Sequence, residues 1–124
     1  MPSTNHPKSR GEDAESLACR FLEGRGLKLL TRNYRSRGGE IDLVMLDRDS
    51  LVFVEVRYRR QTRFGHAAET VSWRKQQRII HCAGCYLSRH RCWNRPARFD
   101  VVSLEGDPAR PRIEWLRNAF GSKG

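Results

Sequence analysis

The stretch Gly39-Glu40-Ile41-Asp42-Leu43-Val44 is followed, after a short polar segment, by Leu51-Val52-Phe53-Val54-Glu55-Val56-Arg57. Both runs contain the β-branched and large apolar residues that favour strands. The segment Asp47-Arg48-Asp49-Ser50 between them has the composition of a turn. We therefore predict a β-hairpin that carries Asp42 on its first strand and Glu55 on its second.

Each predicted strand places one carboxylate among apolar neighbours, and burying such a charge is costly unless it is paired or binds a cation. Asp42 and Glu55 on adjacent strands would supply the hard oxygen ligands that Mg²⁺ prefers. The alternation of residues is equally compatible with both side chains pointing to the solvent face of a half-buried sheet. Both interpretations stay open from the pattern alone.

The composition favours a polyanionic partner. The chain of 124 residues has 24 Lys and Arg against 14 Asp and Glu, a net charge of +10, and most of the cations are arginine. The guanidinium group of arginine forms bidentate hydrogen bonds with phosphate, so we expect nucleic acid, and DNA in particular, as the partner. The alternative is an arginine excess that only reflects a GC-rich genome.

The sequence predicts a cytoplasmic protein with no membrane segment. No run approaches the roughly 20 apolar residues of a transmembrane helix, and the first ten residues lack the apolar core of a secretory signal. The length suits one domain. We expect a flexible tail over residues 1–10, a single domain over 11–120 and a C-terminal tail over 121–124.

Apolar periodicity predicts a helix over residues 12–25 and a second over 68–89, with Val71 and Trp73 packed near the start of the second. A strand is predicted over residues 27–34, with Leu27, Leu29 and Leu30 pointing inward. The remaining elements are a basic loop over 58–66 and strands over 98–104 and 113–116. The order α-β-β-β-α-β-β is typical of an α/β sandwich.

Four cysteines could in principle bind zinc: Cys19, Cys82, Cys85 and Cys92. Structural zinc usually needs two Cys-x-x-Cys knuckles in loops. Here the single pair, Cys82-Ala83-Gly84-Cys85, falls inside a predicted helix. We therefore expect reduced cysteines and no structural zinc.

An ordered set of short motifs runs through the chain: Gly11-Glu12-Asp13-Ala14-Glu15, Arg32-Asn33-Tyr34-Arg35, Gly39-Glu40-Ile41-Asp42, Phe53-Val54-Glu55-Val56-Arg57, Phe64-Gly65, Lys75, Arg98-Phe99-Asp100 and Ala119-Phe120. This set resembles the YraN-like family of small bacterial proteins. That family is similar in fold to restriction endonucleases and archaeal Holliday junction resolvases, whose core motif is Asp, a spacer and then (Asp/Glu)-x-Lys. The resemblance implies a restriction-endonuclease-like α/β sandwich with a central mixed five-stranded sheet flanked by helices.

The resemblance also implies ligands for Mg²⁺ or Mn²⁺. Asp42 and Glu55 match the two acidic positions of the motif and would bind the metal, with the Val56 carbonyl as a third ligand. Glu15 matches the first-helix Glu of the resolvases and would reach the metal directly or through water. Glu40 belongs to the family's Gly-Glu-x-Asp signature, without an assigned role.

The lysine of the motif falls on Arg57 in this chain, which is the main departure from the pattern. Arginine can stabilise negative charge, but it stays protonated and cannot transfer a proton. Lys75 is one candidate to substitute for the lysine; the alternative is that it lies on a solvated helix face. Arg57, Arg59, Arg60, Arg63 and Lys75 would then hold the nucleic-acid backbone.

Taken together, the motifs favour a metal-dependent nuclease that acts on DNA phosphodiester bonds. One alternative is a nucleic-acid-binding protein on the same fold without catalysis, which the presence of Arg57 favours. Another is a small interaction protein whose basic charge is incidental. Because resolvases act as dimers across two strands, the resemblance also favours a homodimer.

Overall fold

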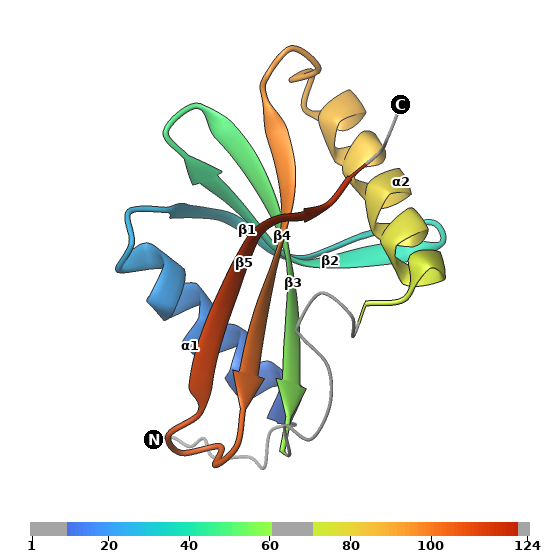
Figure 1. Cartoon of the computed structure of the whole chain (residues 1–124). Coiled ribbons are helices and arrows are strands. Elements are labelled where there is room, and N and C mark those ends of the chain that lie inside the picture. Colours follow the sequence, from blue (N-terminus) through green and yellow to red (C-terminus); the bar gives the residue numbers. More distant parts are fainter. Residues whose placement is uncertain (1–9, 61–70, 122–124) are drawn as a thin grey trace, which may run out of the picture.

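A computed structural model describes residues 10–60 and 71–121, with side chains described from residue 14 onward in the first helix. The described part of the chain forms two helices and five strands (Figure 1). These are α1 (Arg10–Glu23), β1 (Lys28–Ser36), β2 (Gly39–Asp47), β3 (Ser50–Arg59), α2 (Trp73–Arg89), β4 (Ala97–Glu105) and β5 (Arg112–Phe120). The predicted order α-β-β-β-α-β-β is confirmed.

The five strands form one mixed sheet in the order β1-β2-β3-β4-β5. Strands β3 and β4 are parallel, and the other neighbours are antiparallel. A parallel pair needs a long crossover connection, and α2 lies within the one that joins β3 to β4. The predicted α/β fold with a mixed five-stranded sheet is therefore confirmed.

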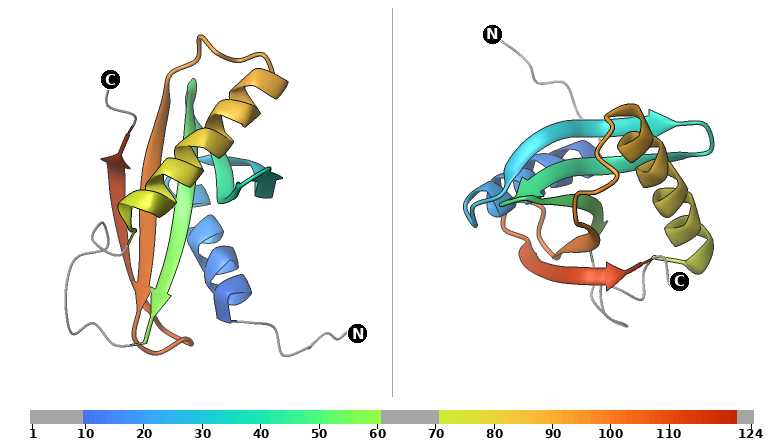
Figure 2. Two further views of the ribbon diagram at one scale, coloured as in Figure 1. Left: turned by 90° about the vertical axis from the view of Figure 1, so that its right-hand side faces the viewer. Right: turned by 90° about the horizontal axis from the view of Figure 1, so that it is seen from above.

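The two helices cover opposite faces of the sheet (Figure 2). Alternate residues of a strand point to opposite faces, so Leu43 and Met45 of β2 pack under α1, whereas Val44 packs under α2. The α1 face also buries Ala18, Leu22, Val52, Val54, Val102 and Leu104. The α2 face also buries Ile41, Phe53, Ile79, Cys82, Tyr86 and Val101.

Strand β2 pairs with β3 only from Leu43 onward, so the two strands are separated at Asp42 and the sheet is open there. The β2–β3 ladder runs from Leu43 opposite Val54 to the turn, while residues 39–41 pair with β1. The β1–β2 hairpin consequently projects sideways until its turn lies beside α2 (Figure 1). There the backbones touch, because a Cβ atom at Gly39 would lie 2.8 Å from the Arg78 carbonyl oxygen.

Two predictions about exposed residues were wrong. Leu30 is 44% exposed rather than inward, because the β1 register shifts between Leu29 and Thr31 and the bulge turns Leu30 outward. Trp73 is 72% exposed rather than packed, because it occupies the first position of α2. The prediction for Val71 was right, since that side chain is buried.

Several predicted boundaries also differ from the structure. Val71 and Ser72 precede α2, which begins at Trp73, and residues 68–70 lie outside the described residues. Strand β3 continues through Tyr58 and Arg59, which were predicted as loop, because β4 pairs with it as far as Glu105. The two predicted tails fall almost entirely outside the described residues and stay predictions. None of the described helices has the length and apolar character needed to cross a membrane.

Candidate active site

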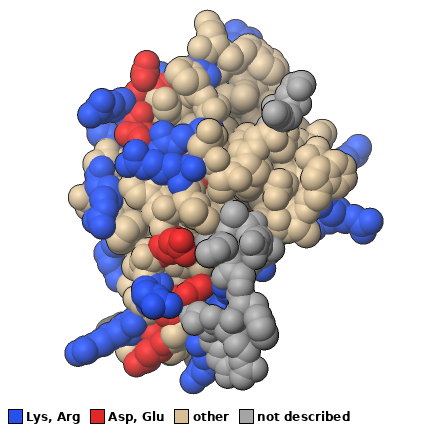
Figure 3. All heavy atoms as spheres, in the orientation of Figure 1, with Lys and Arg blue, Asp and Glu red and all other residues tan. Residues whose placement is uncertain are grey.

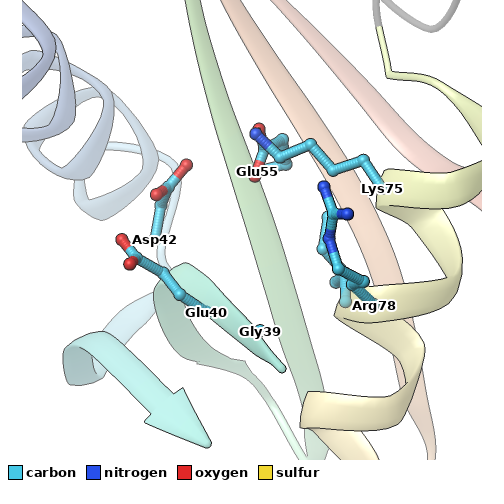
Figure 4. Close-up of a pocket in the computed structure, with 7 residues that line it drawn as sticks. Gly39, Glu40, Asp42, Glu55, Lys75 and Arg78 are labelled. Carbon is cyan, nitrogen blue, oxygen red and sulfur yellow. The ribbon is translucent and has the colours of Figure 1, made fainter. Parts of the chain in front are cut away.

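Asp42 and Glu55 face one cleft at the place where β2 leaves β3 (Figure 4). The cleft has a volume of about 490 Å³ and is lined by Gly39, Glu40, Asp42, Glu55, Lys75, Arg78 and Ile79. A second hollow of about 390 Å³ shares Asp42, Glu55 and Lys75 and adds Ala14, Glu15, Val56, Arg57 and Tyr58. The carboxylates therefore lie on neighbouring strands and converge, and the solvent-facing alternative is wrong for Glu55, which is 3% exposed.

Asp42 is held by one main-chain hydrogen bond inside this cleft. The Val56 N–H group donates to Asp42 Oδ2 at 2.8 Å. Burial, followed by the negative charges of Glu55 and Glu15, raises the pKa of Asp42 from 3.8 to about 8, although the Val56 hydrogen bond opposes the shift. Without a cation, Asp42 therefore keeps its proton at neutral pH.

Glu55 is paired with a lysine from the other side of the cleft. Lys75 Nζ lies 2.7 Å from Glu55 Oε2, whereas Arg57 Nη1 lies 3.8 Å from the same oxygen. Lys75 sits in the first turn of α2, where its N–H group donates to the N-cap oxygen of Ser72 at 3.1 Å. The alternative that Lys75 only occupies a solvated helix face is therefore wrong.

Glu15 reaches the cleft from α1. Its Oε1 atom is buried and has no hydrogen-bond partner among the described residues, although Arg32 Nη2 lies 3.5 Å away. Across residues 10–60 and 71–121, no three His, Cys, Asp or Glu side chains gather closely enough to hold a metal ion by themselves. The charge of Glu55 thus acts on Asp42 most strongly, and that of Glu15, which lines the second hollow, acts on it less.

The structure separates the arginines that the sequence grouped together. Arg57 lines the second hollow, beside Glu55, but Arg59 forms an ion pair with Glu105 at 3.0 Å. Arg60 is exposed at the end of β3, and Arg63 lies outside the described residues. Arg57 and Arg59 thus have different surroundings, and residues 61–66 of the predicted basic loop lie outside the described residues.

Two further residues complete the rim of the cleft. Glu40 is partly exposed and lies 3.4 Å from Arg35 across the β1–β2 hairpin. Arg78 lines the cleft one helical turn after Lys75, and Figure 4 shows both side chains extending from α2. Sequence reasoning missed Arg78, but its spacing of three residues from Lys75 on a predicted helix was an available signal.

The four cysteines lie away from the cleft lining. Cys19 and Cys82 are buried, and burial raises the pKa of both thiols. Cys85 and Cys92 are partly exposed, and Cys85 Sγ lies 3.9 Å from His81 Nε2. All four are free thiols, and the absence of structural zinc stays a prediction.

Comparison with known proteins identifies the family. The model of the uncharacterised protein family UPF0102 matches residues 14–104, which include Asp42, Glu55 and all of α2. The chain belongs to this family. A UPF0102 protein of Pseudomonas putida is 53% identical over 97% of this chain and 98% of its own length. UPF0102 proteins of Nitrosococcus oceani and Colwellia psychrerythraea are 52% and 47% identical, over 96% and 90% of this chain and 95% and 88% of their own lengths. The YraN-like resemblance is thus confirmed.

Proposed function

We propose that this UPF0102 protein hydrolyses phosphodiester bonds in nucleic acid with a divalent metal ion, Mg²⁺ or Mn²⁺, at the cleft. One observation carries the proposal: two carboxylates on adjacent strands share a half-closed cleft with a lysine that touches one of them. A structural site would be expected to pair each carboxylate with a cation. Here Asp42 instead lies beside a second carboxylate, at a cost in stability.

The donor groups fit a hard divalent cation. Asp42 and Glu55 provide carboxylate oxygens, and the Val56 carbonyl points to the same side of β3 as its N–H group, which faces Asp42. The Oε1 atom of Glu15 is buried without a hydrogen bond and lies 3.5 Å from Arg32 Nη2, so in this proposal Glu15 contacts the ion through water. When bound, the ion would polarise a phosphate and lower the pKa of a bound water.

The cationic side chains of the cleft have distinct roles in this proposal. Lys75 takes the place of the motif lysine from α2 and stabilises negative charge on the scissile phosphate, while its contact with Glu55 orients that carboxylate. Arg57, which is farther from Glu55 than Lys75 is, adds a permanent positive charge at the edge of the site. Asp42 must lose its proton before it can act as a ligand, so we expect activity to rise with pH up to about 8.

The proposal is tested by incubating the purified protein with duplex, single-stranded and four-way-junction DNA in Mg²⁺, Mn²⁺ or EDTA. Asp42→Asn and Glu55→Gln should each lower the cleavage rate by about 100-fold or more, because each removes a charged ligand. Lys75→Ala should cause a comparable loss. Lys28→Ala is the matched control, because Lys28 is an exposed lysine on β1 outside the cleft lining.

Two results would contradict the proposal. Cleavage that survives Asp42→Asn would mean that the cleft is not the active site. A wild-type protein that binds DNA but cleaves no substrate with either metal would favour the non-catalytic binding protein. If Arg57 were the charge stabiliser instead of Lys75, Arg57→Ala would abolish cleavage and Lys75→Ala would leave it intact.

A further inference from the structure

A basic groove lies next to the cleft, between the β1–β2 hairpin and α2. We call it the hairpin–helix groove; its volume is about 660 Å³, and its lining consists of residues 34–37 together with His81, Gly84, Cys85, Ser88 and Arg89. Three of these lining residues are arginines (Arg35, Arg37 and Arg89), and none is acidic. On the face drawn in Figure 3, the right-hand edge, where Figure 1 places α2 and the hairpin turn, carries basic but no acidic side chains.

The groove is held open by contacts within the protein. Gly39 and the Arg78 carbonyl pack backbone against backbone, with no room for a side chain between them. The Cys82 thiol donates a weak hydrogen bond to the Tyr34 carbonyl at 3.8 Å, and the Tyr34 and Tyr86 rings meet edge to face at 5.1 Å. Because the hairpin and the helix are fixed to each other, a ligand would not have to organise the groove on binding.

The arginines of the groove are available to a ligand. Arg37 and Arg89 form no ion pair within the described residues. Arg35 Nε lies 3.4 Å from Glu40 Oε1, but the Arg35 side chain is 74% exposed. Arg59, in contrast, is already bound to a carboxylate of β4. A phosphate therefore meets unpaired guanidinium groups in the groove, which can form charge-assisted, bidentate hydrogen bonds without breaking an existing pair.

The groove and the cleft both lie along α2, and the backbone contact between Gly39 and Arg78 lies between them. Lys75 and Arg78 line the cleft, and Arg89 lies at the far end of the groove. Lys75 and Arg89 are 14 positions apart, which spans about 21 Å of helix, the rise of about six nucleotides of one DNA strand. His81 and Ser88 add polar groups between these ends that can bind phosphate oxygens.

We propose that the hairpin–helix groove binds the phosphodiester backbone of the nucleic-acid strand that leaves the candidate active site. The direction of the strand rests on the proposed function, because it assumes that the scissile phosphate sits in the cleft. Binding in the groove itself needs neither metal nor cleavage. The groove contacts are to phosphate, so they contribute affinity and register rather than recognition of base sequence.

The test is a fluorescence-anisotropy titration of a labelled single strand and a labelled duplex in EDTA, repeated over a series of salt concentrations. The double variant Arg37→Ala/Arg89→Ala should bind roughly 10-fold more weakly at low salt, and its plot of log affinity against log salt should be shallower by about two. The control Arg20→Ala/Arg110→Ala removes the same charge from exposed arginines that line neither the cleft nor the groove. It should retain nearly the wild-type salt slope.

Three further readouts decide the interpretation. Arg37→Lys/Arg89→Lys should restore the salt slope, and an unchanged thermal midpoint of each variant shows that the fold is intact. Wild-type affinity and slope in the alanine variant, or an equal loss in the control, would overturn the groove assignment while leaving cleavage by the cleft intact. Groove-dependent binding by a protein that never cleaves would overturn the proposed function alone and support the groove.

Discussion

Two aspartates of the sheet have opposite surroundings. Asp100 is fully buried and accepts hydrogen bonds from Arg98 Nε at 3.0 Å and from Trp115 Nε1 at 2.9 Å. Asp42 accepts one main-chain hydrogen bond and faces the carboxylate of Glu55. The first aspartate is satisfied by its neighbours and supports the fold, whereas the second is repelled by one and marks a site that needs a cation.

The pKa of Asp42 predicts how stability depends on pH. Because its pKa is about 8 in the folded protein and 3.8 ordinarily, the folded protein keeps a proton that the unfolded chain loses between about pH 4 and pH 8. The free energy of unfolding should therefore fall as pH rises through this window. Asp42→Asn keeps an oxygen for the Val56 N–H group but carries no charge, so its free energy of unfolding should not fall in this way as pH rises.

Thermal melts in EDTA measure the effect. At about pH 8 the Asn variant should melt at least about 4 °C above wild type, a difference of about 1 kcal/mol or more, and below about pH 4 the two should agree. A wild-type protein as stable as the variant at pH 8 would show that Asp42 is not destabilised by its neighbours.

At the scale of elements, Asp100 joins β4 to an irregular β5. The register of this pair shifts between Phe99 and Val101, and Asn118 adopts a positive φ of 51° at the irregularity. Asp100 Oδ1 accepts the Asn118 N–H group at 2.9 Å, so one carboxylate on β4 fixes the path of the last part of β5. Phe120 consequently reaches Phe99 and stacks on it, with ring centroids 5.2 Å apart.

Replacing this carboxylate should destabilise the protein at neutral pH. Asp100→Asn removes the buried negative charge that pairs with the partly buried Arg98, and we expect the free energy of unfolding to fall by about 2–4 kcal/mol. Arg112→Ala is the control, because Arg112 is 74% exposed in its pair with Glu105 and should matter by less than about 0.5 kcal/mol. Urea unfolding measures the free energy of unfolding of both variants. Equal effects would mean that the contacts of Asp100 with β5 stabilise the protein no more than an exposed ion pair does.

Local patterns in the sequence were sufficient for most of the elements. The apolar period predicts α1, and the turn between Asp47 and Ser50 predicts the hairpin that carries Asp42 and Glu55; both are confirmed. The bulge at Leu30 and the extension of β5 beyond Leu116 were not predictable. The first depends on pairing with β2, and the second on Asp100, which is distant in sequence.

The candidate site was only half predictable for the same reason. Its two carboxylates stand out because each interrupts an apolar run. The contact of Lys75 with Glu55 depends instead on how α2 docks beside the opening between β2 and β3, and no local pattern encodes that docking. The pairing of Arg59 with Glu105 likewise depends on the parallel alignment of β3 and β4.

At the scale of the whole molecule, the net charge of +10 predicts strongly salt-dependent binding of nucleic acid. Affinity for duplex DNA should fall by about 10³-fold between about 50 and 200 mM salt if at least six phosphates are neutralised. Gel-shift titrations across this range measure the slope. Undetectable binding at low salt would favour the interaction protein whose charge is incidental. The predicted homodimer is measured separately, by sedimentation of the protein with and without DNA.

The carboxylate pair also makes the cleft an exchanger of protons for metal ions. At about pH 7 an Asp42 with a pKa of about 8 is mostly protonated, so binding one divalent ion should release about one proton to the buffer. The heat of Mn²⁺ binding should then depend on the ionisation enthalpy of the buffer, with a slope near one proton per ion. In Asp42→Asn that dependence should vanish even if weak binding persists through Glu55. Calorimetry in two buffers can therefore detect occupation of the cleft without any knowledge of its substrate.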